Sequence, residues 1–170
     1  AVAELRQQSA DCLVSFGLAG GLHPALAAGD VILADRVETL AGQGFALDGR
    51  LRERLASALD AAGATFHGGV MIGVDRIIAT PAEKRTIASA SAGLAADMES
   101  YDVAAAAGEF PVAILRVVVD PASRAIPASV LGALGGDGNV RPFKLLAGLL
   151  RRPAEIGALL ALAGDHGKAR

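Results

Sequence analysis

Cysteine, histidine and aromatic residues are scarce in this sequence of 170 residues, and each scarcity excludes a class of site. Cys12 is the only cysteine, which excludes an intramolecular disulfide and a cysteine-based zinc site. We expect this thiol to be buried in the apolar stretch around it. The three histidines lack the spacing of metal ligands, so we expect no metal. Aromatic residues make up 4% of the chain, which disfavours a sandwich of aromatic-rich strands.

The chain also lacks a large charge of one sign and a long uninterrupted apolar run. Its formal net charge is −2, so no basic field indicates binding to nucleic acid. Although 52% of the residues are hydrophobic, no apolar run of about 18 residues is free of charge, glycine and proline. No signal peptide is visible, because residues 1–10 are polar. Together with the single thiol, these features predict a cytoplasmic protein without a transmembrane helix.

Short apolar runs alternate with segments of helical period along the chain. We expect strands over 12–16, 30–37, 65–80, 94–98 and 111–119, a glycine-rich loop over 17–29, and helices over 51–63, 81–91, 99–108, 141–150 and 153–163. This order predicts a single α/β domain over 1–170 with a mixed, largely parallel central sheet flanked by helices. Such a sheet usually opens on a strand, whereas residues 1–9 read as the end of a helix. We therefore expect that an N-terminal strand is absent from this chain.

Three polar or glycine-rich stretches follow directly after predicted strands. Gly17–Gly21 follows the strand at 12–16, the residues Asp97, Met98 and Glu99 follow the alanine-rich strand, and Asp120 follows the strand at 111–119. Ligands bind beyond the carboxyl ends of strands in open α/β sheets. If these strands are parallel, the three stretches meet at one edge.

Each of these features also has a structural explanation. The glycines favour a tight turn, Glu99 suits a helix start, and Asp120 before Pro121 suits a turn. The glycine pattern is neither GxGxxG nor GxxxxGK[ST], which disfavours a dinucleotide-binding oxidoreductase and a P-loop protein. Taken singly, the residues indicate structure more than catalysis.

Taken together, three stretches of the chain resemble one family. "VSFGLAGGLHPALAAGDVILAD", "AADMES" and "AILRVVVDPAS" resemble the purine and uridine phosphorylase superfamily, which includes the nucleosidases that cleave methylthioadenosine. The resemblance covers residues 12–37 and 70–122. The tail at 137–165 is similar to one branch, the hopanoid-biosynthesis-associated phosphorylases, which is implicated in removing adenine from adenosylhopane.

The resemblance implies a three-layer nucleoside phosphorylase-like fold that cleaves a purine N-glycosidic bond, by phosphorolysis or hydrolysis. It implies a purine nucleoside as substrate, in this branch a lipid-linked one close to a membrane surface. It further implies a homo-oligomer and no cofactor, with inorganic phosphate as a candidate co-substrate. The alternative is a nucleoside-binding module without catalytic activity. Release of a purine base by the protein separates these two readings.

The resemblance also implies roles for individual residues. Asp120 matches the acid that protonates N7 of the leaving purine, and Glu99 matches the carboxylate that holds the ribose hydroxyls. Met98 matches the residue on the sugar face, while Ile77 and Ile78 lie where the family builds its base pocket. The remaining substrate-binding positions that the motifs imply are Leu18, Ala19, Gly20 and Asp97.

These roles suit the chemistry of the reaction, with two departures from the family pattern. Cleavage of an N-glycosidic bond builds negative charge on the base, which a proton at N7 neutralises. An aspartic acid at a desolvated strand end can hold such a proton near neutrality. Leu18, however, stands where the family commonly has a serine that contacts phosphate or the nucleophilic water, and Ser15 stands where phosphorylases often carry an arginine. The choice between phosphorolysis and hydrolysis therefore stays open.

Overall fold

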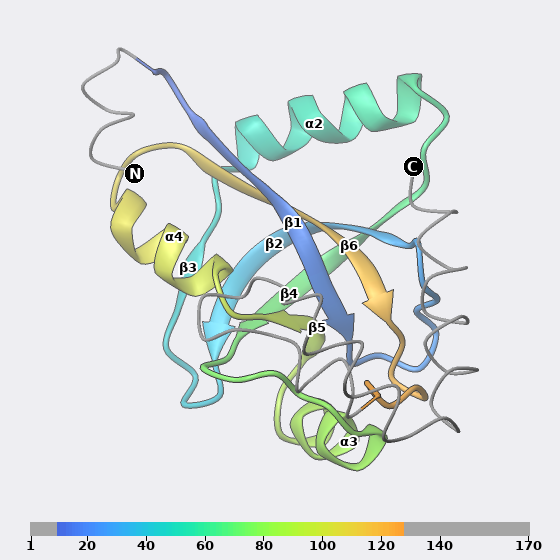
Figure 1. Cartoon of the computed structure of the whole chain (residues 1–170). Helices are drawn as coiled ribbons and strands as arrows, with labels where there is room; N and C mark the ends of the chain where they lie inside the picture. The colour runs from blue at the N-terminus through green and yellow to red at the C-terminus, as the bar shows by residue number, and fades with distance from the viewer. Residues whose placement is uncertain (1–9, 128–170) are drawn as a thin grey trace, which may run out of the picture.

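The computed structural model describes residues 10–127, which form six strands and three helices around one sheet (Figure 1). The strands are β1 (Leu13–Gly21), β2 (Val31–Thr39), β3 (Gly44–Ala46), β4 (Phe66–Gly73), β5 (Gly93–Asp97) and β6 (Val112–Asp120). The helices are α2 (Gly49–Ala61), α3 (Pro81–Ala90) and α4 (Ser100–Ala107). The helices predicted over 141–150 and 153–163 and the helix end over 1–9 lie outside the described residues.

The sheet is mixed and closes on itself. Its strand order is β3-β2-β4-β5-β1-β6, and β6 returns to pair with β2. The pairs β1–β6, β2–β4 and β4–β5 are parallel, whereas β1–β5, β2–β3 and β2–β6 are antiparallel. The predicted α/β fold, with a mixed sheet flanked by helices, is therefore confirmed. Closure through β2 and β6 curls the sheet, so it is not a flat middle layer.

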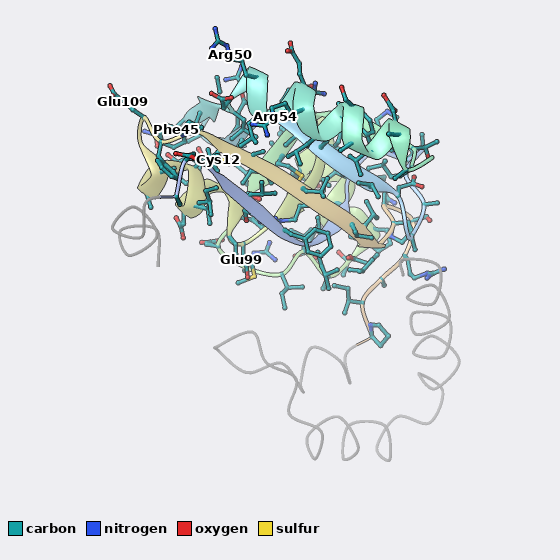
Figure 2. All side chains as sticks on the ribbon, turned by 90° about the horizontal axis from the view of Figure 1, so that it is seen from above. Cys12, Phe45, Arg50, Arg54, Glu99 and Glu109 are labelled. Carbon is teal, nitrogen blue, oxygen red and sulfur yellow. The ribbon has the colours of Figure 1, made fainter. Side chains whose placement is uncertain are left out.

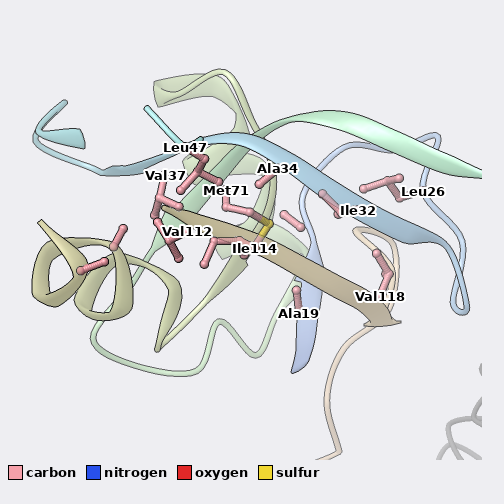
Figure 3. Packing of buried hydrophobic residues seen from close by; sticks show 13 residues of the cluster. Ala19, Leu26, Ile32, Ala34, Val37, Leu47, Met71, Val112, Ile114 and Val118 are labelled. Carbon is pink, nitrogen blue, oxygen red and sulfur yellow. The ribbon is translucent and has the colours of Figure 1, made fainter. Parts of the chain in front are cut away.

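The interior of the curled sheet holds the main apolar core (Figure 3). Ile32 and Val37 from β2, Met71 from β4, and Ile114 and Val118 from β6 are all fully buried. Burial along β6 is nearly continuous, as expected for a strand covered on both faces, whereas in β2 Asp35 and Arg36 are exposed. This packing fixes the strand ends that carry the polar residues.

Local sequence signals place the helix starts. Asp48 caps α2 by accepting a hydrogen bond from the backbone N–H of Leu51 at 2.7 Å. Thr80 and Glu83 form a capping box at the start of α3, where Pro81 occupies the first turn. The predicted helices at 51–63, 81–91 and 99–108 therefore match α2, α3 and α4, with shifts of one or two residues at their ends.

Three predictions about local structure were wrong. The glycines Gly17–Gly21 were expected in a loop, but they form the second half of β1, paired to β6 and β5. The strand expected over 65–80 ends at Gly73, because the apolar residues beyond it turn away from the sheet into a loop. Cys12 was expected to be buried, but it is exposed because it precedes the first residue of β1. The short strand β3 was not predicted, because three residues carry too little pattern.

None of the helices in the described part of the chain combines the length and the apolar character that a membrane span needs.

Candidate active site

The site lies where β1 and β6 end, on the side of the sheet that faces α3 (Figure 1). A cavity of about 450 Å³ opens there, within the usual range of about 300–1,000 Å³ for small-molecule sites. Three segments that are distant in the sequence line it: the end of β1, the turn between β5 and α4, and the end of β6. The loop between β4 and α3 closes a fourth side.

All nine residues predicted for the site line this cavity: Leu18, Ala19, Gly20, Ile77, Ile78, Asp97, Met98, Glu99 and Asp120. The expected meeting of strand ends is thus observed, although the strands are not all parallel. β1 and β6 are parallel, with Gly20 opposite Asp120. β5 runs antiparallel to β1 but pairs with it only through the last residues of both strands, so their ends still overlap.

Asp120 is buried at the end of β6, with 5% of its surface exposed. Its Oδ2 accepts a hydrogen bond from Lys84 Nζ at 2.6 Å. Burial raises the pKa of Asp120 above its ordinary value, and the positive charge of Lys84 opposes this rise. A carboxyl group in this environment can hold a proton at a higher pH than a solvated aspartate can.

Gly20 leaves the room that the Asp120 carboxyl group occupies. A Cβ atom at this position would lie 3.2 Å from Asp120 Oδ2 and 3.3 Å from Oδ1, closer than nearly all real Cβ contacts. Glycine therefore occurs at this position because the backbone of the strand lies close to a carboxyl group, and it does not indicate a loop here.

Asp97 is buried at the end of β5 and has its partners inside the protein. Its Oδ2 accepts hydrogen bonds from Arg116 Nε at 2.5 Å and from Ser100 Oγ at 2.6 Å. Its Oδ1 accepts one from the backbone N–H of Ser100 at 3.1 Å, which caps α4. Arg116 is fully buried on β6 and also donates to Ser15 O and Ser15 Oγ, at 2.8 and 3.1 Å. Asp97 thus fixes the turn that carries the next two residues, and its contact with a substrate stays a prediction.

Met98 and Glu99 follow on this turn, and both are exposed. Figure 2 shows Glu99 on the side of the described region away from Arg50 and Arg54 of α2. Glu99 occupies the N-cap position of α4, as its structural explanation expects, but its side chain makes no capping hydrogen bond there. An exposed carboxylate on the rim of a cavity is free to accept hydroxyl groups from a ligand.

The loop between β4 and α3 supplies an apolar wall. Ile78 is buried in a small cluster with Leu22 of the loop after β1 and Ile87 of α3, and Ile77 is half-buried beside it. Val74 and Ile126 extend the same lining. The wall lies on the same cavity as Asp120, so an aromatic base could rest on it and reach the carboxyl group.

Sequence reasoning missed two cations that line the cavity, Arg76 and Lys84. Arg76 pairs with Glu83 at 2.7 Å, and its side chain is 61% exposed. Lys84 is 1% exposed. Its signal was present in the sequence, because Lys84 and Ile87 lie three residues apart and share one face of α3. Within residues 10–127, no group of acidic, histidine and cysteine side chains is arranged to hold a metal ion.

Comparison with known proteins agrees with this geometry. The family model described as the phosphorylase superfamily matches residues 1–133. Among solved structures, a putative methylthioadenosine nucleosidase from Weissella paramesenteroides is 25% identical, with a TM-score of 0.67, over 71% of this chain and 63% of that one. The 5′-methylthioadenosine/S-adenosylhomocysteine nucleosidase from Neisseria meningitidis, in complex with methylthio-immucillin-A, is 27% identical, with a TM-score of 0.66, over 72% and 62%.

The nucleosidase of the same type from S. pneumoniae, solved with a transition-state inhibitor, is 26% identical, with a TM-score of 0.65, over 72% of this chain and 62% of that one. The chain therefore spans somewhat less than two thirds of the length of these structures. Among curated proteins, none matches the chain.

Proposed function

The chain belongs to the phosphorylase superfamily, and from this we propose that it cleaves the N-glycosidic bond of a purine nucleoside and releases adenine. The observation that carries the proposal is the cavity itself. A buried carboxyl group with a raised pKa, Asp120, shares it with an apolar wall and with an exposed carboxylate, Glu99. Asp120 is suited to protonate the leaving base, the apolar wall to pack against the aromatic faces of that base, and Glu99 to accept hydrogen bonds from the ribose hydroxyls.

In the proposed reaction the bond between C1′ and N9 breaks, and its electron pair leaves with the base. Asp120 transfers its proton to N7, which neutralises the charge that develops on the purine. An oxygen atom of water or of hydrogen phosphate forms the new bond to C1′. The proton that this nucleophile gives up restores Asp120 to its acid form, so protons and electrons balance over one cycle.

We propose water as the more effective nucleophile for this chain. A phosphate dianion needs several donors or a cation to replace its lost hydration. Leu18 offers no hydroxyl group to the cavity, and the two cations that line it in the described region already have carboxylate partners, Glu83 and Asp120. These features support weak use of phosphate.

The finer proposal for the substrate is adenosylhopane. The tail at 137–165 that resembles the hopanoid branch lies outside the described residues. Support comes from apolar side chains beside the cavity: Leu18 and Met98 line it and are 55% and 50% exposed, and Phe16 on the same face of β1 is 68% exposed. A nucleoside with an apolar tail could cover this surface, as could a second copy of the chain, and we also propose a homo-oligomer.

Adenine release tests the proposal directly. The 170-residue protein would be incubated with adenosine, methylthioadenosine and adenosylhopane, across a phosphate titration from zero, and the free base and the sugar product measured by chromatography. We expect adenine and a free sugar, with little dependence on phosphate. Saturable, phosphate-dependent formation of a sugar phosphate would overturn the proposed nucleophile. Tight nucleoside binding with no base release from any substrate would favour the binding module.

A further inference from the structure

Lys84 is a cation buried in the protein interior beside the proposed acid. It lies in the first turn of α3 with 1% of its side chain exposed, next to the apolar residue Ile87 on the same helix face. Burial of an ammonium group is costly unless it is paired and hydrogen-bonded. The surroundings of Lys84 must therefore supply that compensation.

Four oxygen atoms surround Lys84 Nζ. They are Asp120 Oδ2 at 2.6 Å, the carbonyl oxygens of Asp120 and Pro121, each at 2.9 Å, and the carbonyl oxygen of Arg124 at 3.2 Å. A neutral amine has two N–H groups and a lone pair, and that lone pair would face an oxygen atom. An ammonium group has three donors and no lone pair. The cluster of acceptors therefore favours the charged form.

These four acceptors all belong to one short segment, the end of β6 and the turn after it. Lys84 thus ties α3 to the residue that carries the carboxyl group and to the turn that follows. Because Nζ holds Oδ2 at 2.6 Å, the orientation of the carboxyl group at the cavity depends on a side chain from a different element.

We infer that Lys84 is a positioning residue that holds Asp120 in place and stays charged, so that it stabilises the carboxylate formed when Asp120 gives up its proton. The inference rests on the proposed function for its catalytic meaning. Burial lets Asp120 keep its proton to a higher pH than a solvated aspartate does, and the adjacent cation makes the loss of that proton easier. An acid with too high a pKa cannot protonate the leaving base, and an acid with too low a pKa has already lost its proton before the reaction begins.

Other charged groups near Asp120 must be considered for any dependence on pH. Arg124, in the turn after β6, lowers the pKa of Asp120 as Lys84 does, but less. Arg76, Asp97 and Glu99 line the same cavity from the β4–α3 loop and from the end of β5. The cavity-lining residues of β1 carry no charge. Lys84 donates a hydrogen bond directly to the Asp120 carboxyl group at 2.6 Å.

The decisive experiment measures the titration of Asp120 itself. The ¹³C NMR signal of its carboxyl group, assigned with Asp120→Asn, would be followed against pH in the wild-type protein, Lys84→Gln and Lys84→Arg. We expect Lys84→Gln to raise the pKa of Asp120 by about 1–3 units, as loss of a close cation does, and Lys84→Arg to leave it within about half a unit of the wild-type value. An unchanged pKa in Lys84→Gln would overturn the inference.

Kinetics supply the second readout. We expect kcat for adenine release to fall about 10–100-fold in Lys84→Gln, and the alkaline limb of the kcat/KM profile to move to higher pH. Arg85→Met is the matched control, because it removes one positive charge from an exposed position on the same helix, and we expect both profiles to stay as in the wild type. A fall in activity with an unmoved alkaline limb would mean that Lys84 acts only as a structural support.

Two further measurements keep the test decisive. If Lys84→Gln does not fold, the ¹⁵Nζ shift of Lys84 in the wild-type protein reports its charge. Persistence of the ammonium form while Asp120 titrates supports the inference, and a neutral amine in that range overturns it. If the wild-type protein releases no base, the proposed function fails, whereas the NMR titration still decides the role of Lys84.

Discussion

Replacement of Asp120 by asparagine is the sharpest test of the proposed chemistry, because it keeps the volume of the side chain and removes the proton. Asparagine has no acidic proton to transfer to N7, so the expected loss is that of general acid catalysis, about 10²–10⁴-fold in kcat. The apolar wall and Glu99 are untouched. Nucleoside affinity should therefore change much less than kcat does.

The same substitution has a second effect that must be separated from the first. Lys84 loses its carboxylate partner but keeps three backbone carbonyls, and the asparagine oxygen can still accept its hydrogen bond. Complete loss of a partner from a buried ion pair costs about 3–5 kcal/mol. Because most acceptors remain, we expect a smaller loss, about 1–3 kcal/mol in the free energy of unfolding.

The assay is adenine release under single-turnover and steady-state conditions, at a temperature well below the unfolding midpoint of the variant. Nucleoside binding by calorimetry shows whether the cavity is intact. Retained binding with a large fall in kcat supports the role of Asp120. Turnover close to the wild-type rate would refute the role of Asp120, because the proposed mechanism has no other residue that protonates N7.

Four further predictions follow from the same geometry. Because burial raises the pKa of Asp120, the folded state binds this proton more tightly than the unfolded state does. The free energy of unfolding and kcat/KM should therefore both fall as pH rises through the pKa of Asp120. Denaturant titrations and rate profiles that rise over this pH range would contradict the prediction. Glu99→Gln should slow ribonucleoside cleavage much more than 2′-deoxyribonucleoside cleavage, and equal losses would exclude a bond to the ribose. Gly20→Ala should lower kcat about 10-fold by displacing the Asp120 carboxyl group, with little change in the unfolding midpoint; an unchanged rate would show that the carboxyl group has room to move. Arg116→Met should destabilise the protein by about 3–5 kcal/mol, because it leaves Asp97 buried without its cation; a chemical denaturation midpoint at the wild-type value would disprove this.

The sequence predicted the architecture because the core strands lie in short, mostly apolar runs. The predicted strands at 30–37 and 111–119 match β2 and β6 to within two residues at each end. The apolar pattern could not predict that the sheet closes on itself. That depends on Val31, Ile32 and Leu33 pairing with residues of β6 more than 80 positions away, and no local period records such a pairing.

The failures beside the site have one physical origin. A local pattern reports what a residue prefers by itself, whereas the residues at the site are set by what lies against them. Gly20 reads as a loop residue until the Asp120 carboxyl group is placed 3.2 Å from where its Cβ would be. Ile77 and Ile78 read as a strand until they are seen to line a cavity. Lys84 shares a helix face with Ile87, which indicates its burial, but the sequence does not show the four acceptors that surround it.

The three carboxylates of the two strand ends therefore divide into two kinds, and burial separates them. Asp97 and Asp120 are buried, and each is bonded to a buried cation from another element, Arg116 and Lys84. A carboxylate with fixed partners defines geometry, and burial raises the pKa of Asp120 above its ordinary value. Glu99 is exposed and makes no capping bond, which is compatible with its proposed role in binding the ribose. One turn and one strand end thus bring together a fixed support, a buried carboxyl group and an exposed carboxylate, the combination on which the proposed cleavage of an N-glycosidic bond rests.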